Sequence, residues 1–241
     1  MLETFLEIGI ATDDIAGAFD ELDSLGFSSV NTGDIREHGY AVVSDGVICI
    51  ALHEAAVTGP WLSFVRPELE SYIRALRRQS IELEIARLGE HEFHEVGFRD
   101  PNEQLITLVE ARTFSPVIGE DIAVSVCGKL LEYSLATGSL EDSALFWQGL
   151  GFETIAEGTE PHRWRRIRGA GLPIGLHESV RFRPGPTFTA DQIGARIDFL
   201  RAKGHDVRAG APIGSSERPS ATLRLNVDMP IYLIEDQASA D

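Results

Sequence analysis

The chain of 241 residues has few of the features that mark several protein classes. It contains two cysteines, Cys49 and Cys127, whose spacing matches no metal site, so we expect reduced thiols in a cytosolic protein. Its apolar runs are too short and too interrupted to span a bilayer. The N-terminal segment MLETFLEIG has no basic residue, which predicts a cytoplasmic protein without a signal peptide.

Basic residues are also scarce, because 21 Lys and Arg against 38 Asp and Glu give a formal net charge of −17. Nucleic-acid binding depends on Lys and Arg that neutralise phosphates, and no basic stripe exists here. An acidic surface favours solubility and attracts cationic ligands. We therefore expect no nucleic-acid partner. We also expect no membrane partner, a small-molecule ligand or substrate, and a monomer or homodimer.

Four segments carry apolar residues at i, i+4 and i+7, the stripe of a helix with one buried face. The stripes are Ile15, Phe19 and Leu22; Leu69, Ile73 and Leu76; Leu140, Ala144 and Trp147; and Ile193, Ile197 and Leu200. The expected helix starts are Asp13 or Asp14, Pro67 before Glu68, Ser139 with Asp142 three residues on, and Thr189 or Asp191. The expected stops are Gly26, Ser80, Gly151 and Gly204. The stripes begin at residues 15, 69, 140 and 193, so gaps of 54, 71 and 53 residues group them as two pairs.

The two halves also match residue by residue at an offset of about 125. DSLGF aligns with QGLGF, IALHE with IGLHE, and ITLVE with IYLIE. Each half reads twice as a strand, a helix and three strands, with turn residues between them. We predict a first module over 1–112, a linker over 113–129, and a second module over 130–241.

The segments IATDDIAGAFDELDSLGF, LATGSLEDSALFWQGLGF and FRDPNEQLITLVE resemble those of the vicinal oxygen chelate superfamily, the glyoxalase, bleomycin-resistance and extradiol dioxygenase group. The resemblance implies an α+β fold of four βαβββ units in two tandem glyoxalase-like modules, each a half-open mixed-sheet barrel. In that family His, Glu or Gln on the first and last strands of the units hold a metal. The corresponding positions here are Glu7, Trp61, Glu132 and about Thr187 on first strands, and Ala51, Thr107, Gly175 and Tyr232 on last strands. Each half thus offers one glutamate, which predicts a degenerate metal site.

Strand alternation separates a bulky face from a face of small residues. In LEIGIAT, Glu7 shares its face with Gly9 and Ala11, and LEYSLAT repeats this pattern around Glu132. The small faces of IALH and IGLH end in His53 and His177. Small residues leave room for a pocket. Because the first and last strands of such units are neighbours in the family, we expect Glu7 near His53 and Glu132 near His177.

A Glu–His pair has three interpretations: a structural hydrogen bond, a ligand contact without chemistry, or a general acid/base or irregular metal site. The candidate ligand-binding residues are Glu7, His53, Trp61, Thr107, Glu132, His177 and Tyr232, and the candidate metal ligands are Glu7, His53, Glu132 and His177. The basic-aromatic segment PHRWRR at 161–166 is interpreted as a solvated edge strand, with a pocket mouth as the alternative.

Two functions follow from these features. The first is a bleomycin-resistance-like protein that binds a small organic molecule in a barrel cavity, with a degenerate metal site. The second is a metal-dependent lyase, isomerase or dioxygenase of the same superfamily that uses a Glu/His site with divalent Fe, Mn, Ni or Zn.

Overall fold

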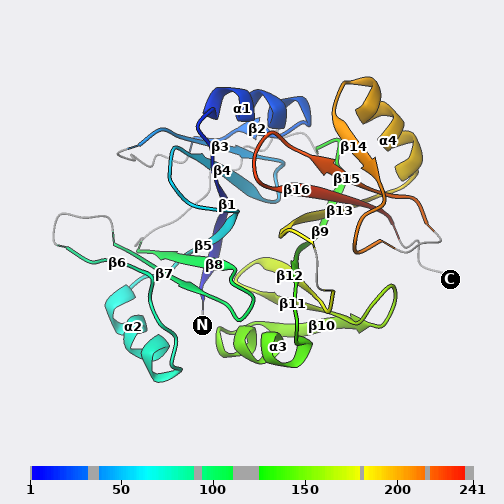
Figure 1. The fold of residues 1–241 in the computed structure, drawn as a ribbon. Helices are drawn as coiled ribbons and strands as arrows, with labels where there is room; N and C mark the ends of the chain where they lie inside the picture. The colour runs from blue at the N-terminus through cyan, green and yellow to red at the C-terminus, as the bar shows by residue number, and fades with distance from the viewer. Residues whose placement is uncertain are drawn as a thin grey trace.

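The computed structural model describes residues 2–31, 38–89, 94–110, 125–179, 182–214 and 218–236. It contains two eight-stranded mixed sheets and four helices (Figure 1). The first half comprises β1 (Thr4–Ala11), α1 (Ile15–Ser24), β2 (Ser28–Ser29), β3 (Tyr40–Ser44), β4 (Cys49–His53), β5 (Trp61–Val65), α2 (Leu69–Arg78), β6 (Ile85–Arg87), β7 (Glu95–Arg99) and β8 (Leu105–Val109). The second half comprises β9 (Lys129–Ala136), α3 (Leu140–Gly149), β10 (Glu153–Gly158), β11 (Trp164–Gly169), β12 (Leu172–His177), β13 (Gly185–Ala190), α4 (Ile193–Ala202), β14 (Asp206–Ala209), β15 (Ser220–Arg224) and β16 (Pro230–Glu235).

The strand order is β2-β3-β4-β1-β5-β8-β7-β6 in the first sheet and β10-β11-β12-β9-β13-β16-β15-β14 in the second. Each unit places its last strand parallel to its first, as in the β1–β4 and β9–β12 pairs. The two units of a half then join through the antiparallel β1–β5 and β9–β13 pairs. The sheets do not close, so each half is an open α+β module. The first βαβββ unit (β1 to β4) thus pairs with the second (β5 to β8).

The four apolar stripes form the four helices, each ten residues long. No helix in the described ranges has the length and apolarity that a membrane crossing requires. The predicted left-handed stops are confirmed, with φ of 87° at Gly26, 60° at Ser80, 96° at Gly151 and 93° at Gly204. Glycine takes this conformation at little steric cost, which is why three of the four helices end on it.

The N-caps follow two different solutions. The Asp14 carboxylate accepts from the Gly17 amide, and the Ser139 hydroxyl accepts from the Asp142 amide, as local capping predicts. The prediction of Thr189 or Asp191 for α4 is wrong, because Gln192 occupies the N-cap with φ 53° and makes no side-chain cap bond. The amides at this helix start donate instead to the Glu235 carboxylate from β16.

The equivalent carboxylate of the first module, Glu110, accepts from the Leu69 amide at the start of α2. The aligned segments ITLVE and IYLIE therefore end in the same tertiary cap, which local sequence cannot reveal.

The two modules share one apolar core. Phe27 and Phe188, from different modules, lie 6.3 Å apart between ring centres. Figure 1 shows α1 and α4 together at one end of the molecule and α2 and α3 at the opposite end. The proposed linker falls largely outside the described residues, but Cys127, near its end, is fully buried, and Lys129 already begins β9.

Candidate functional site

Glu7 and Glu132 lie on β1 and β9, the strands near the middle of each sheet, and both residues are buried, with 1 % of their surface exposed. The parallel pairing places His53 beside Ala11 and His177 beside Ala136. Each glutamate consequently faces the histidine of the neighbouring strand across the concave face of its module. The structure brings together both Glu–His pairs that strand alternation predicted.

In the second module Glu132 is fully bonded. Its Oε1 lies 2.6 Å from His177 Nε2, and Ser134 Oγ donates to the same oxygen. Arg166 Nε donates to Oε2, also at 2.6 Å. Burial alone would raise the pKa of Glu132, but the hydrogen bond and charge of His177, together with the Arg166 guanidinium, lower that pKa to about 2. The carboxyl group is therefore ionised at neutral pH.

In the first module no Lys or Arg side chain of the described residues pairs with Glu7. Tyr40 donates its hydroxyl to Glu7 Oε2 at 2.8 Å. His53 Nε2 lies 3.5 Å from Glu7 Oε1, without the geometry of a hydrogen bond. This nitrogen belongs to a side chain that is 6 % exposed, and it has no hydrogen-bond partner among the described residues. The first module thus holds a buried polar atom that an incoming group can satisfy.

A second histidine extends each pair, and sequence reasoning missed it. His38 Nε2 lies 3.0 Å from His53 Nδ1, and His162 Nε2 lies 3.0 Å from His177 Nδ1. Burial and the charge of His177 lower the pKa of His162. A signal was present, because His38 and His162 are 124 residues apart, the same separation as His53 and His177.

The strand registers identify where the modules differ. Tyr40 pairs with His53 as Trp164 pairs with His177, so Tyr40 and Trp164 occupy equivalent positions on β3 and β11. Two residues on, Val42 pairs with Ala51, whereas Arg166 pairs with Gly175. The position that carries the guanidinium in the second module therefore carries an isopropyl group in the first.

Each Glu–His pair lines its own cavity. The first cavity has a volume of about 320 Å³, and its walls include Glu7, His38, His53, Trp61 and Thr107. The second has about 210 Å³, and its walls include Glu132, Trp164, Arg166 and His177. Tyr232 does not join the latter group, because it lines a separate cavity of about 550 Å³ with Phe182 and Arg183. Its hydroxyl donates to the Arg183 carbonyl, and its ring packs against Phe182.

Two glycines on the small faces make room for site residues. A Cβ on Gly9 would lie 2.1 Å from the Trp61 ring, and a Cβ on Gly175 would lie 1.9 Å from Glu132 Oε1. Part of the space predicted for a ligand is therefore occupied by these two side chains. At the position equivalent to Gly175, the first module has Ala51.

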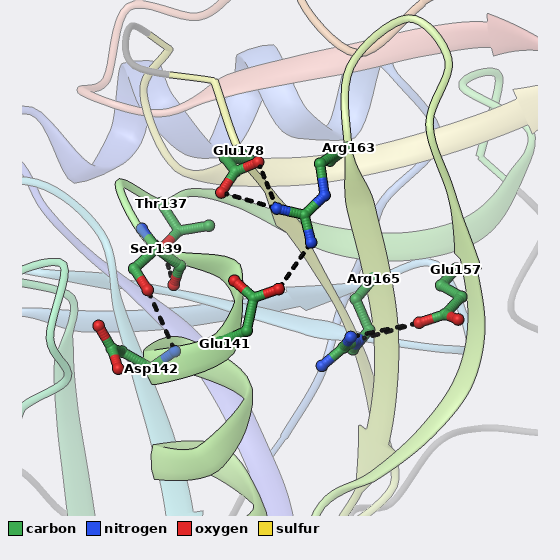
Figure 2. A network of polar contacts seen from close by, with 8 residues as sticks. All are labelled: Thr137, Ser139, Glu141, Asp142, Glu157, Arg163, Arg165 and Glu178. Atoms are coloured by element: carbon green, nitrogen blue, oxygen red, sulfur yellow. Dashed lines mark hydrogen bonds and ion pairs between the residues drawn. The ribbon is translucent and has the colours of Figure 1, made fainter.

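The interpretation of segment 161–166 as a solvated edge strand is wrong. β11 lies inside the sheet, between β10 and β12, so both of its edges are paired. Its side chains alternate: Trp164 and Arg166 line the cavity, whereas Arg163 and Arg165 form ion pairs on the outer face. Figure 2 shows Arg163 between Glu141 and Glu178, with Arg165 directed toward Glu157.

A divalent metal ion needs about three protein ligands, and the described residues do not bring three together. Across the described ranges, no group of three or more His, Cys, Asp and Glu side chains could hold an ion. Glu7 and His53 supply two donors in the first module. In the second, Arg166 already places a cation on Glu132, and a metal ion would have to displace it.

No protein-family model and no curated protein matches the chain, whereas many solved structures do. The 2,3-dioxygenase LapB from Pseudomonas sp. KL28 superposes with a TM-score of 0.66 at 13 % identity, covering 98 % of this chain and 92 % of that one. A variant of homoprotocatechuate 2,3-dioxygenase from B. fuscum in complex with HPCA gives 0.66 at 12 % identity, covering 98 % and 72 %. The Mn(II)-bound glyoxalase from Novosphingobium aromaticivorans gives 0.63 at 11 % identity, covering 98 % and 83 %.

These neighbours are extradiol dioxygenases and a glyoxalase, all members of the superfamily that the sequence motifs resemble. The superposition extends over both sheets, since it covers nearly the whole chain. The chain therefore has the fold of the vicinal oxygen chelate superfamily, built as two tandem modules of βαβββ units.

Proposed function

We propose that this protein binds a small organic molecule in the cavity of its first module, without a divalent metal. The observation that carries the proposal is the buried Nε2 of His53, which lacks a partner among the described residues and lines that cavity beside Glu7. Leaving a buried polar group unsatisfied costs about 1–3 kcal/mol, and a ligand group that bonds to it recovers that free energy. The cavity volume of about 320 Å³ falls within the range of small-molecule sites.

The cavity also has walls suited to a small organic ligand. The Trp61 ring, which lines the cavity, lies 5.0 Å from the His53 ring, and the Tyr40 ring lies 4.8 Å from the His53 ring behind the lining. Thr107 and Ser63, which hydrogen-bond to each other, add hydroxyl groups to the lining. Aromatic walls with a few polar groups are typical of ligand pockets. The dioxygenase in complex with HPCA supports the proposal, since the same fold accommodates a small ligand there.

The Trp61 indole provides the assay. The chain has three tryptophans, and the Trp147 and Trp164 indoles donate to Asp100 and to the Glu160 carbonyl. In ¹⁵N-labelled protein, Trp61→Phe assigns the remaining indole signal. We expect some members of a mixed library of small neutral and charged aromatic compounds to shift this signal with saturation. A library that leaves the Trp61 signal unmoved at about 10 mM, where even millimolar affinity saturates, overturns the proposal.

Metal content tests the second half of the proposal. Protein incubated with excess Zn²⁺ or Mn²⁺ and then dialysed should retain far less than one equivalent of metal by elemental mass spectrometry. Stoichiometric metal that is lost in Glu7→Gln would contradict the metal-free assignment and would restore the metal-dependent enzyme as the better function.

An acid–base enzyme is the second candidate, favoured by the series from His38 to His53. His38 is exposed, and its Nε2 contacts Nδ1 of the buried imidazole, so the series connects solvent with the cavity. Such a series can pass a proton between a bound ligand and water. Any compound that shifts the Trp61 signal can be incubated in D₂O with wild type and with His53→Gln. Deuterium uptake at carbon with the wild type alone would support catalysis, whereas no uptake would leave binding as the whole function.

A further inference from the structure

The first cavity differs from the second in how its buried carboxylate is compensated. Glu132 is paired with the Arg166 guanidinium at 2.6 Å, whereas Glu7 bonds to the neutral hydroxyl of Tyr40. Both glutamate residues are 1 % exposed and occupy the same place in the repeat. Burying a carboxylate without a cation beside it lowers the stability of the fold. Comparison with the equivalent carboxylate of the second module therefore indicates that a cation is missing beside Glu7 among the described residues.

The other charged residues that the structure describes in the first cavity do not supply that cation. Arg87 lines the cavity but pairs with Glu95 at 3.2 Å, so these two charges offset each other. Glu54, also in the lining, is exposed and adds another negative charge. None of the described residues that line the cavity is a lysine. Among the described residues of the lining, the carboxylates Glu7, Glu54 and Glu95 therefore outnumber the guanidinium of Arg87.

The unpartnered His53 Nε2 adds an independent indication. Where His53 Nδ1 donates to His38 Nε2, its Nε2 presents a lone pair, and this atom lies 3.5 Å from Glu7 Oε1. Two acceptors at that separation can both receive hydrogen bonds from one donor nitrogen that lies to one side of them, about 2.8–3.0 Å from each. The Trp61 indole, whose ring lies 5.0 Å from the His53 ring, provides an aromatic wall that favours a cation.

Building on the binding function proposed above, we infer that the ligand of the first module carries a positively charged nitrogen, an ammonium or amidinium group. This group donates to Glu7 Oε1 and His53 Nε2 and supplies the positive charge that Arg166 supplies in the second module. An organic body attached to the nitrogen packs against Trp61. The net charge of −17 favours the approach of such a cation.

Two probes of matched shape test the ligand class: benzylamine, which is charged at neutral pH, and benzyl alcohol, which is not. Titrations follow the Trp61 indole signal and the heat of binding at low salt. We expect benzylamine to bind at least about tenfold more tightly, because hydrogen bonds to a charged group are roughly twice as strong as neutral ones. Glu7→Gln, which keeps the shape of the side chain, should remove this preference, while Glu157→Gln on the exposed face of β10 should retain it.

Val42→Arg adds a sharper variant, since it installs the cation of the second module at its equivalent position in the first. We expect this variant to abolish benzylamine binding, because the new guanidinium would pair with the Glu7 carboxylate in place of the ligand's ammonium group. Should Val42→Arg fail to fold, Glu7→Gln alone decides the matter, because its amide keeps the Tyr40 contact. Equal affinity for both probes would overturn the inferred charge while leaving small-molecule binding intact. If neither probe shifts Trp61 but other compounds of the library do, the inferred ligand class is also wrong.

Discussion

The Glu132 carboxylate should make the stability of this protein depend on pH in a defined window. Its pKa is lowered from an ordinary value of 4.5 to about 2, despite burial that acts in the opposite direction. One pKa unit corresponds to 1.36 kcal/mol, so ionised Glu132 stabilises the folded chain by about 3 kcal/mol. Because the folded pKa is the lower one, this contribution is complete above pH 4.5 and is lost as the pH falls toward 2.

Glu132→Gln removes the titration while preserving the shape of the side chain. We expect the variant to be less stable than wild type by about 3 kcal/mol at pH 7, because Arg166 and His177 lose their anionic partner. The difference should shrink steadily below pH 4.5 and approach zero near pH 2. Guanidinium unfolding curves at a series of pH values, followed by circular dichroism, measure it.

Glu157→Gln serves as the matched control, since its Arg165 ion pair lies on the surface with the Glu157 side chain 66 % exposed. Its stability should follow the wild-type pH profile, because exposed ion pairs contribute little. A stability difference between wild type and Glu132→Gln that stays constant from pH 7 to pH 2 would refute the reasoning. The carboxylate would then act through packing alone.

Other substitutions test the contacts around both sites. Gly175→Ala should destabilise the fold by about 2 kcal/mol in urea unfolding, because its Cβ meets a carboxylate oxygen, whereas Gly138→Ala, with open space around it, should change stability by less than about 0.5 kcal/mol. Equal effects would argue against the close approach. Tyr40→Phe should cost about 1 kcal/mol in the same assay through its lost hydrogen bond, and an unchanged midpoint would contradict that bond. Glu235→Ala, which removes a helix cap, should lower the melting temperature more than Asp236→Ala does.

Local sequence patterns predicted much of the secondary structure. Apolar stripes, a capping serine and glycine stops specify the helices, because these signals depend on contacts within a few residues. Local patterns did not predict the N-terminal cap of α4, because the Gln192 amide donates to the carboxylate of Glu235, 43 positions away in sequence. The sequence also did not determine that the first βαβββ unit pairs with the second, because the exposed edge of its first strand can in principle pair with a strand of any other unit.

The candidate site shows the same division. The period of two along the strands grouped Glu7 and Glu132 with the small residues of their strands and placed His53 and His177 at the ends of similar faces. The expectation that each glutamate lies near its histidine came from the family resemblance, in which the first and last strands of a unit are neighbours. What the sequence could not determine was the partner of each carboxylate, because Tyr40 and Arg166 come from adjacent strands through long-range register. Tertiary structure alone decided that Glu132 pairs with the Arg166 guanidinium and that Glu7 bonds to the Tyr40 hydroxyl, with no Lys or Arg of the described residues beside it. The physical reason is that charge compensation in a buried site depends on distances of a few ångströms between strands, and spacing along the chain does not encode those distances.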